Sequence, residues 1–156
     1  MKIVVGQAAP DFSLYDSNKK KVTLSENKGQ TVLLLFFPLA FTSVCTKELC
    51  SVRDNIAWYN AINAKVFGVS VDALQTLAKF KEDQQLNFTL LSDFNKDVSR
   101  GYDSIYELFG YNMKGVSKRS AFVIDKEGIV QYAEVLENAG EMPDFEQIQK
   151  IIAGLD

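Results

Sequence analysis

Two cysteines, Cys45 and Cys50, are the only thiols in the chain of 156 residues, and both lie in the stretch FFPLAFTSVCTKELC, residues 36–50. A run of apolar residues leads into this stretch and a helical pattern follows Pro38, so we expect Cys45 where a strand enters a helix. The first turn of a helix has unpaired backbone N–H groups and the positive end of the helix dipole, which favour an anion. A thiolate is such an anion, so this position favours a nucleophilic sulfur.

The chain contains no histidine, which excludes Ser-His-Asp and Cys-His triads, histidine-ligated zinc and a histidine general base. An unperturbed thiol is only about 3% ionised at pH 7, and helix N-termini or nearby cations increase that fraction. An activated cysteine in this chain therefore needs a helix end, a cation, or both.

Less specific interpretations of both thiols stay open at this point. Cys45 could be a small buried hydrophobe, and Cys50 could be a core cysteine on the inner face of its helix. On an intact helix, residues five positions apart point about 140° apart, with Cα atoms about 8 to 9 Å apart. This exceeds the limit of about 7 Å for a disulfide, so a bond between the two sulfurs requires the first helical turns to unwind.

Composition indicates one globular domain, residues 1–156, in the cytoplasm. A chain with 47% hydrophobic residues, 24% charged residues and two cysteines does not look like a disulfide scaffold. The net charge of −3 and the lack of a basic cluster beyond residues 19–21 argue against nucleic acid as the main partner. The apolar run in the N-terminal segment MKIVVGQAAPDF is too short for a signal-peptide core or a membrane span.

The elements of the N-terminal half predict a β-α-β unit. Short strands are expected at 11–14 and 21–24, joined by a polar turn, and the apolar run TVLLLFF at 31–37 suits a central strand covered on both faces. Apolar residues at helical spacing predict a helix over 43–63, and KVFGVSV at 65–71 predicts a second buried strand.

The C-terminal half completes an α/β pattern. Asp72 is expected to cap a helix, and a short strand over 88–91 precedes a polar helix through Val98, Tyr102 and Tyr106. Two strands, 120–124 and 129–135, flank the turn sequence DKEG, and a final helix begins at Pro143. This order is the thioredoxin arrangement: a central mixed sheet flanked by helices, with an N-terminal β extension and an insertion over 86–109.

The motif around Cys45 resembles a known family. Pro38, Thr42 and Cys45 match the Pro-x-x-x-Thr-x-x-Cys motif of peroxiredoxins, and the preceding strand and Glu48 also match. GQAAPDFSL, LLSDF and KRSAFVIDKEGIV look like family segments in the expected order, so the resemblance covers nearly the whole chain. FFPLAFT, LLSDF and VQYAEV look most like the one-cysteine alkyl hydroperoxide reductase E type, whereas Cys50 is similar to the resolving cysteine of the Q type.

The resemblance implies a thiol-dependent peroxidase without metal, haem or flavin. Cys45 would be the thiolate that attacks a peroxide and becomes a sulfenic acid. Thr42 would orient the sulfur and the peroxide, and Arg119 would stabilise the thiolate and the leaving oxygen. Pro38 would shield the sulfur from water, and Glu48 would orient arginine side chains.

The resemblance leaves the later steps between two routes. Cys50 would resolve the sulfenic acid as an intramolecular disulfide, or an external thiol would do so in a one-cysteine mechanism. The implied partners are a peroxide, a thioredoxin-like protein or a low-molecular-weight thiol as reductant, and a second copy in a homodimer, with no nucleic acid and no membrane. Two rival functions are a thioredoxin-fold disulfide reductase, which would need a Cys-x-x-Cys pair, and a binding module in which Cys45 is merely buried.

Other residues near the motif have two interpretations each. Arg53 is either a second active-site arginine or half of a surface pair with Asp54. The aromatic residues Trp58, Tyr59, Phe41 and Tyr106 fit core or interface positions better than substrate contacts.

Overall fold

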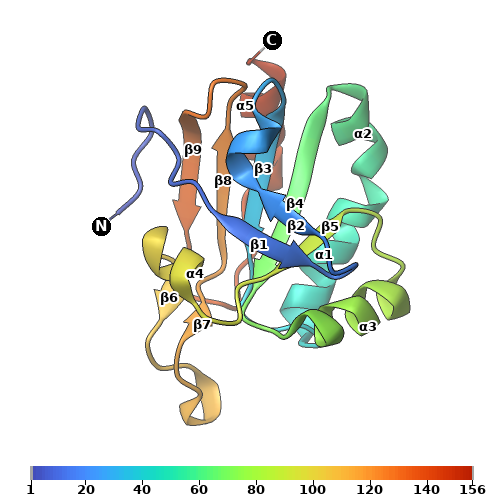
Figure 1. The fold of residues 1–156 in the computed structure, drawn as a ribbon, viewed down its shortest axis with the longest axis vertical. Helices are drawn as coiled ribbons and strands as arrows, with labels where there is room; N and C mark the ends of the chain where they lie inside the picture. Colours follow the sequence, from blue (N-terminus) through green and yellow to red (C-terminus); the bar gives the residue numbers. More distant parts are fainter. Residues whose placement is uncertain (1, 156) are drawn as a thin grey trace.

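The structure is a computed structural model that describes residues 2–155 (Figure 1). The strands are β1 (Ser13–Asp16), β2 (Lys21–Thr23), β3 (Thr31–Phe36), β4 (Ala64–Ser70), β5 (Thr89–Ser92), β6 (Ile105–Tyr106), β7 (Val116–Ser117), β8 (Ser120–Ile124) and β9 (Val130–Val135). The helices are α1 (Ser43–Asp54), α2 (Ile56–Ala61), α3 (Leu74–Gln84), α4 (Asp97–Gly101) and α5 (Phe145–Ala153), with short 3-10 helices η1 (Leu24–Asn27) and η2 (Gly110–Asn112).

A mixed sheet with strand order β2-β1-β5-β4-β3-β8-β9 forms the centre of the described residues. Strand β3 pairs in parallel with β4 and antiparallel with β8, and β4 pairs in parallel with β5. The antiparallel pair β1–β2 extends the sheet beyond β5. The predicted thioredoxin-like sheet with an N-terminal β extension is therefore confirmed.

The apolar run of β3 builds the core on both faces of the sheet. Successive strand residues point to opposite faces, so Leu33, Leu35 and Phe37 join one cluster, and Val32, Leu34 and Phe36 join the other. The first cluster also contains apolar residues of α1, α3 and α5, and the second contains Phe12, Leu24 and Tyr102. A strand covered on both faces explains why this run shows no polar alternation.

The single helix predicted over residues 43–63 is divided into α1 and α2. Asn55 leaves helical geometry with φ −109° and ψ 9°, and its side-chain amide donates to the Ser51 carbonyl at 2.9 Å. An asparagine that bonds nearby backbone in this way competes with the helical hydrogen bonds. Because hydrophobic spacing does not register such competition, the sequence pattern missed the break.

The polar helix predicted through Val98, Tyr102 and Tyr106 is also shorter than expected, because α4 ends at Gly101. The chain then enters the small antiparallel pair β6–β7, in which Ile105 pairs with Ser117. In Figure 1 this hairpin projects from the lower end of the molecule, with η2 at its tip. The tip carries the exposed side chains of Leu108, Tyr111 and Met113.

The predicted β8–β9 hairpin is confirmed, and the Asp125 carboxylate stabilises its turn. One Asp125 oxygen accepts from the backbone N–H groups of Glu127 and Ile129 at 2.9 and 3.0 Å, and Gly128 has φ +86°. These contacts lower the pKa of Asp125 although partial burial opposes the shift. At the other end of the chain, strand β1 begins at Ser13, two residues later than predicted. Among the helices of residues 2–155, none is long and apolar enough to cross a membrane.

Candidate active site

The loop between β3 and α1 carries the motif residues. The buried Pro38 follows Phe37, whose N–H donates to the Val69 carbonyl at 2.9 Å. Phe41 has φ +65°, and its half-exposed ring packs against Phe80 with centroids 5.1 Å apart. This loop therefore turns sharply before α1 begins.

Asp72 stabilises this loop, contrary to the prediction that it caps a helix. Its Oδ2 accepts from the Ala40 N–H at 2.8 Å and from the Ser70 hydroxyl at 2.6 Å. Helix α3 instead begins after Ala73, and no side chain caps its first turn. Sequence spacing could not show this role, because Asp72 and Ala40 meet only when β3 and β4 lie side by side.

Thr42 occupies the N-cap position of α1 with extended backbone, and Cys45 is the third residue of the helix. The Thr42 hydroxyl donates to the Leu39 carbonyl at 2.8 Å and does not cap the helix. Its oxygen lone pairs are therefore available to a donor in the adjoining pocket. The thiol of Cys45 lies in the first helical turn, as predicted, and the residue is 0% exposed.

Arg119 brings a buried cation to Cys45. Its Nη2 donates to the Cys45 sulfur at 3.2 Å, its Nη1 to Glu48 Oε1 at 2.6 Å, and its Nε to the Ala139 carbonyl at 3.0 Å. The residue is 2% exposed, so these bonds hold the guanidinium in one orientation away from water. A cation at this distance favours negative charge on the sulfur.

Glu48 lies one turn after Cys45 on the same helix and is 0% exposed. Burial raises the pKa of its carboxyl to about 7, although the neighbouring Arg119 opposes the shift. The second carboxylate oxygen, Oε2, has no hydrogen-bond partner among the described residues. The Glu48 carboxyl thus has a single cationic partner for two oxygens.

A pocket of about 240 Å³ lies beside the buried Cys45, which is one of its lining residues. Its lining residues are Pro38, Thr42, Ser43, Val44, Cys45, Phe109, Arg119, Ala139 and Gly140. Sequence reasoning missed Phe109 and the segment at Ala139, which show no motif. Phe109 stacks on Tyr106 with ring centroids 5.5 Å apart, and the Tyr106 hydroxyl donates to the Leu136 carbonyl at 2.7 Å.

Cys50 lies on the same helix but in different surroundings. Its thiol donates to Gln84 Oε1 at 3.5 Å, and both cysteines are free thiols. Arg53 donates to the Gln84 carbonyl at 2.6 Å and pairs with Asp54 at 3.0 Å. Arg53 therefore lies near Cys50 and the end of α3, and not beside the sulfur of Cys45.

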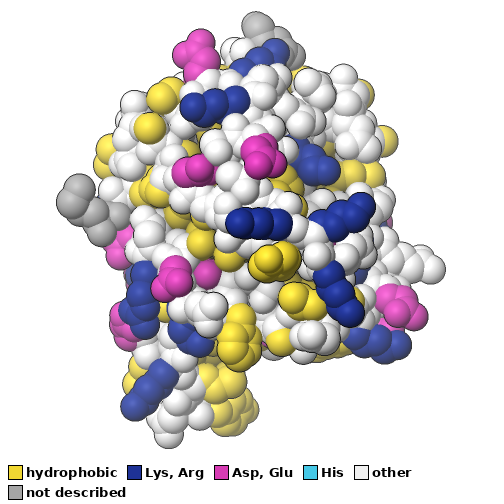
Figure 2. All heavy atoms as spheres, viewed as in Figure 1, with side chains coloured by type: hydrophobic (Ala, Val, Ile, Leu, Met, Phe, Trp, Pro, Cys, Tyr) yellow, Lys and Arg dark blue, Asp and Glu magenta, His cyan; other side chains and the backbone are white. Residues whose placement is uncertain are grey.

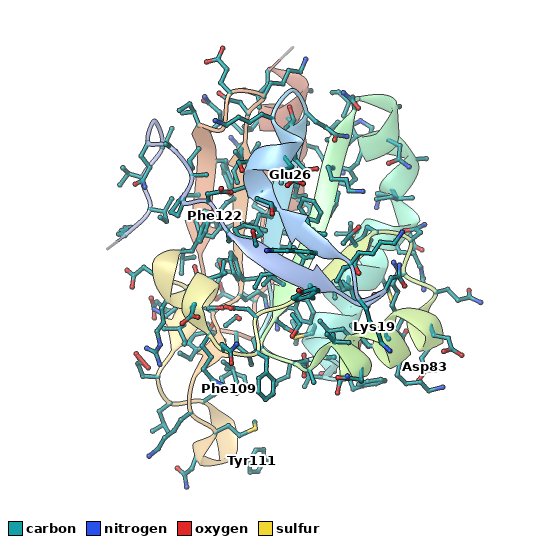
Figure 3. All side chains as sticks on the ribbon, viewed as in Figure 1. Lys19, Glu26, Asp83, Phe109, Tyr111 and Phe122 are labelled. Atoms are coloured by element: carbon teal, nitrogen blue, oxygen red, sulfur yellow. The ribbon has the colours of Figure 1, made fainter. Side chains whose placement is uncertain are left out.

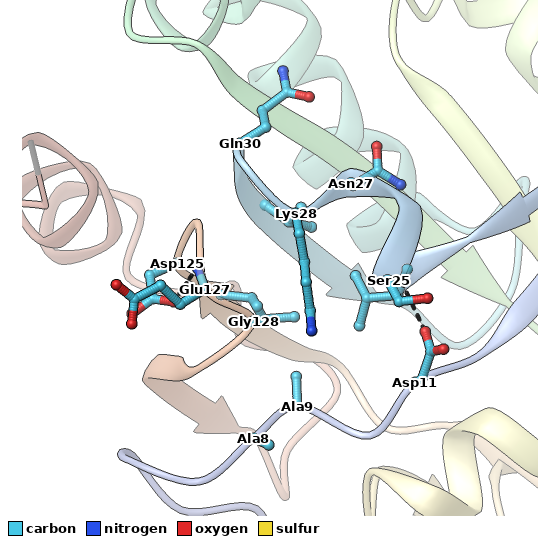
Figure 4. A pocket seen from close by; sticks show the side chains of 13 residues that line it. Ala8, Ala9, Asp11, Ser25, Asn27, Lys28, Gln30, Asp125, Glu127 and Gly128 are labelled. Carbon is cyan, nitrogen blue, oxygen red and sulfur yellow. Dashed lines mark hydrogen bonds between the residues drawn. The ribbon is translucent and has the colours of Figure 1, made fainter.

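The figures show two further features, a hydrophobic patch at the lower end of the molecule and a second pocket. Figure 3 labels Phe109 and Tyr111 on the projecting hairpin, where Figure 2 shows hydrophobic atoms gathered at the lower end of the molecule. A separate pocket of about 210 Å³ lies near the start of β3, where Figure 4 shows Lys28 and Asp11 on different walls. It shares no lining residue with the Cys45 pocket, so it contributes no group to the thiol site.

A thioredoxin-like sheet that presents a cysteine at a helix start, beside a buried arginine, defines a cysteine-based redox protein. Residues 5–133 match the model of the AhpC/TSA family. A putative peroxiredoxin of Mycobacterium tuberculosis is 35% identical over 135 residues, which cover 85% of each chain. The crystal structure of peroxidoxin BcpB from Mycobacterium tuberculosis superposes with a TM-score of 0.85 at 28% identity, over 97% of each chain.

The chain therefore belongs to the AhpC/TSA family, and it is a thiol-dependent peroxidase of the peroxiredoxin class. A second relative, chloroplastic peroxiredoxin Q of Oryza sativa subsp. japonica, is 38% identical over 131 residues, which cover 84% of this chain and 58% of the rice protein. The chain thus spans somewhat more than half the length of that relative.

Proposed function

We propose that Cys45 is the peroxidatic residue of a peroxidase that reduces hydrogen peroxide and organic hydroperoxides. The thiolate attacks one peroxide oxygen, a sulfur–oxygen bond forms, and the oxygen–oxygen bond breaks. Cys45 becomes a sulfenic acid, and the leaving oxygen takes up a proton as water or an alcohol. The contact of 3.2 Å between the Cys45 sulfur and Arg119, at the wall of an open pocket, carries this proposal.

The pocket residues divide the remaining tasks. Arg119 stabilises the thiolate and then the negative charge that develops on the leaving oxygen. Thr42 accepts a hydrogen bond from the peroxide, since its own proton is directed to the Leu39 carbonyl. Pro38 shields the sulfur from water, and Glu48 orients the Arg119 guanidinium through their bond of 2.6 Å. Phe109 adds an apolar wall that accommodates the carbon chain of an organic hydroperoxide.

We further propose that Cys50 resolves the sulfenic acid. Its thiolate attacks the Cys45 sulfur, a disulfide forms as the sulfur–oxygen bond breaks, and the sulfenic hydroxyl takes up one proton and leaves as water. Because both residues belong to one helix, the first turns of α1 must unwind for this step. A thioredoxin-like protein or a low-molecular-weight thiol then restores both thiols by exchange. Cys50 also matches the Q type, the type named by the rice relative.

The experiment measures peroxide consumption by the reduced protein and its Cys45→Ser and Cys50→Ser variants, with intact mass after one equivalent of peroxide. Loss of two hydrogens that depends on both cysteines supports internal resolution. Addition of one oxygen at Cys45 while Cys50 is present establishes the one-cysteine route instead. If the wild type shows no fast reaction that depends on Cys45, the peroxidase role of that residue fails.

The proposed partner beside the reductant is a second copy of the chain. Phe41 within the active-site loop is 51% exposed, and Tyr111 on the hairpin tip is 99% exposed. Aromatic side chains are enriched at protein–protein interfaces. Sedimentation of the wild type and of a Tyr111→Ser variant at several concentrations tests the homodimer. Two cysteines in a chain of 156 residues suit a reducing compartment, and we propose the cytoplasm.

A further inference from the structure

Three buried groups of the active site form one charge cluster. Arg119 contacts the Cys45 sulfur with Nη2 at 3.2 Å and the Glu48 carboxylate with Nη1 at 2.6 Å. All three residues are at most 2% exposed. One cation therefore lies between two groups that can each carry a negative charge, and water does not screen them.

The cluster has few other charges around it. From β6, Tyr106 faces Arg119 and Cys45, and burial raises the pKa of its hydroxyl, so it stays neutral near neutral pH. Glu137 and Lys118 pair with each other at 2.7 Å towards the surface. Within the part of the chain that the structure describes, Glu48 Oε2 has no hydrogen-bond partner. If both Glu48 and Cys45 were ionised, the buried cluster would have one negative charge in excess.

We propose that Glu48 and Cys45 share a single negative charge opposite Arg119, so that Glu48 holds the proton whenever Cys45 is a thiolate. The proton of the Cys45 thiol then moves to the Glu48 carboxylate, and the net charge of the cluster does not change. This inference rests on the proposed role of Cys45 and adds a second function to Glu48. Besides orienting Arg119, Glu48 limits the amount of thiolate by competing for the same cation.

The competition predicts an unusual direction for a substitution in an active site. Glu48→Gln keeps an oxygen that accepts from Arg119 and removes the competing charge. The fraction of thiolate at Cys45 then increases near pH 7, where the Glu48 carboxyl titrates. If Glu48 only orients Arg119, the same substitution lowers the thiolate fraction or leaves it unchanged.

The test follows Cys45 without using peroxide. In a Cys50→Ser background, the rate of alkylation by iodoacetamide and the ultraviolet absorbance of the thiolate are measured across pH. Glu48→Gln is expected to accelerate alkylation near pH 7 by about tenfold and to make the pH curve steeper, since a competing buried charge is removed. The control Glu137→Gln removes an exposed charge and should change the rate by less than about twofold.

A reciprocal measurement keeps Glu48 intact, because linkage requires the effect to be mutual. With isotope-labelled glutamate, nuclear magnetic resonance follows the Glu48 carboxyl in the reduced wild type and in Cys45→Ser. Glu48 should ionise at lower pH in the Cys45→Ser variant, because its competitor is absent. Identical Glu48 titrations, or an alkylation curve unchanged by Glu48→Gln, would overturn the shared charge. Since neither readout involves peroxide, failure of the peroxidase role would be seen separately in the consumption assay.

Discussion

Glu48→Gln should change how the stability of the protein depends on pH. The carboxyl of Glu48 is fully buried, and burial raises its pKa from an ordinary 4.5 to about 7 in the folded protein. Between these values the folded state binds a proton that the unfolded state has released. The free energy of unfolding of the wild type therefore receives a contribution that falls as pH rises from about 4.5 to about 7.

The size of this contribution follows from the shift of the pKa. At about 1.4 kcal/mol for each pH unit, the shift corresponds to about 3 kcal/mol. The amide that replaces the Glu48 carboxyl does not titrate, so the variant lacks this slope. Urea unfolding of both proteins at a series of pH values, under reducing conditions, measures the difference in unfolding free energy. The variant should gain about 3 kcal/mol relative to the wild type between the acid and neutral ends of the window.

A matched control separates Glu48 from a general effect of removing a carboxylate. Glu146→Gln on α5 removes an exposed carboxylate, which pairs with Lys150 at 3.5 Å. Its difference from the wild type should stay nearly constant over the same pH range. A constant difference for Glu48→Gln as well would refute the reasoning, because it would mean that the bond to Arg119 fully offsets burial.

Three further substitutions test the geometry of the site and of the fold. Arg119→Lys should slow oxidation of Cys45 by about a hundredfold in stopped-flow measurements, because a lysine cannot bond the sulfur, Glu48 and a carbonyl in one plane. An undiminished rate would contradict the role assigned to Arg119. Asp72→Asn places an amide donor or a weaker acceptor at the Ala40 N–H. We expect Cys45 to be oxidised about tenfold more slowly, and the free energy of unfolding in urea to fall by about 1 to 2 kcal/mol. A loss of stability alone would show that the loop does not position Cys45. Asp125→Ala should lower the free energy of unfolding by about 1 to 3 kcal/mol, because the carboxylate that bonds the turn is lost. Peroxide consumption should stay unchanged, because the turn lies at the other end of β8 from Arg119 and does not line the pocket. A slower reaction would argue against that separation.

The raised pKa of Glu48 bears on the reactivity of Cys45, because both groups contact Arg119. A single arginine contacts the sulfur and the carboxyl together, so its one positive charge offsets only one of the two negative charges that these groups can carry. In the proposed sharing of one charge, Glu48 is a proton acceptor that does not line the pocket beside Cys45. This arrangement connects the stability of the folded chain and the reactivity of Cys45 through the same buried group.

Local patterns in the sequence determined much of the architecture. The apolar run at 31–37 predicted β3, and the DKEG turn predicted the β8–β9 hairpin, because strand burial and turn chemistry depend on adjacent residues. The position of Cys45 in a first helical turn was also readable, since it needs only a strand followed by a helix. Helix lengths were less readable, because the side chain of Asn55 ends α1 within an unbroken apolar pattern.

The partners of Cys45 were decided by the tertiary structure. Phe36 pairs with Ser120 across β3 and β8, so Arg119 lies beside the loop that leads to Cys45, although 74 positions separate them in sequence. Only resemblance to a family pointed to that arginine, and no local pattern did so. The contact of Asp72 with Ala40 and the wall formed by Phe109 likewise required the order of strands and the β6–β7 hairpin. Spacing along a chain determines which residues share an element, whereas contacts between elements depend on how the sheet is assembled.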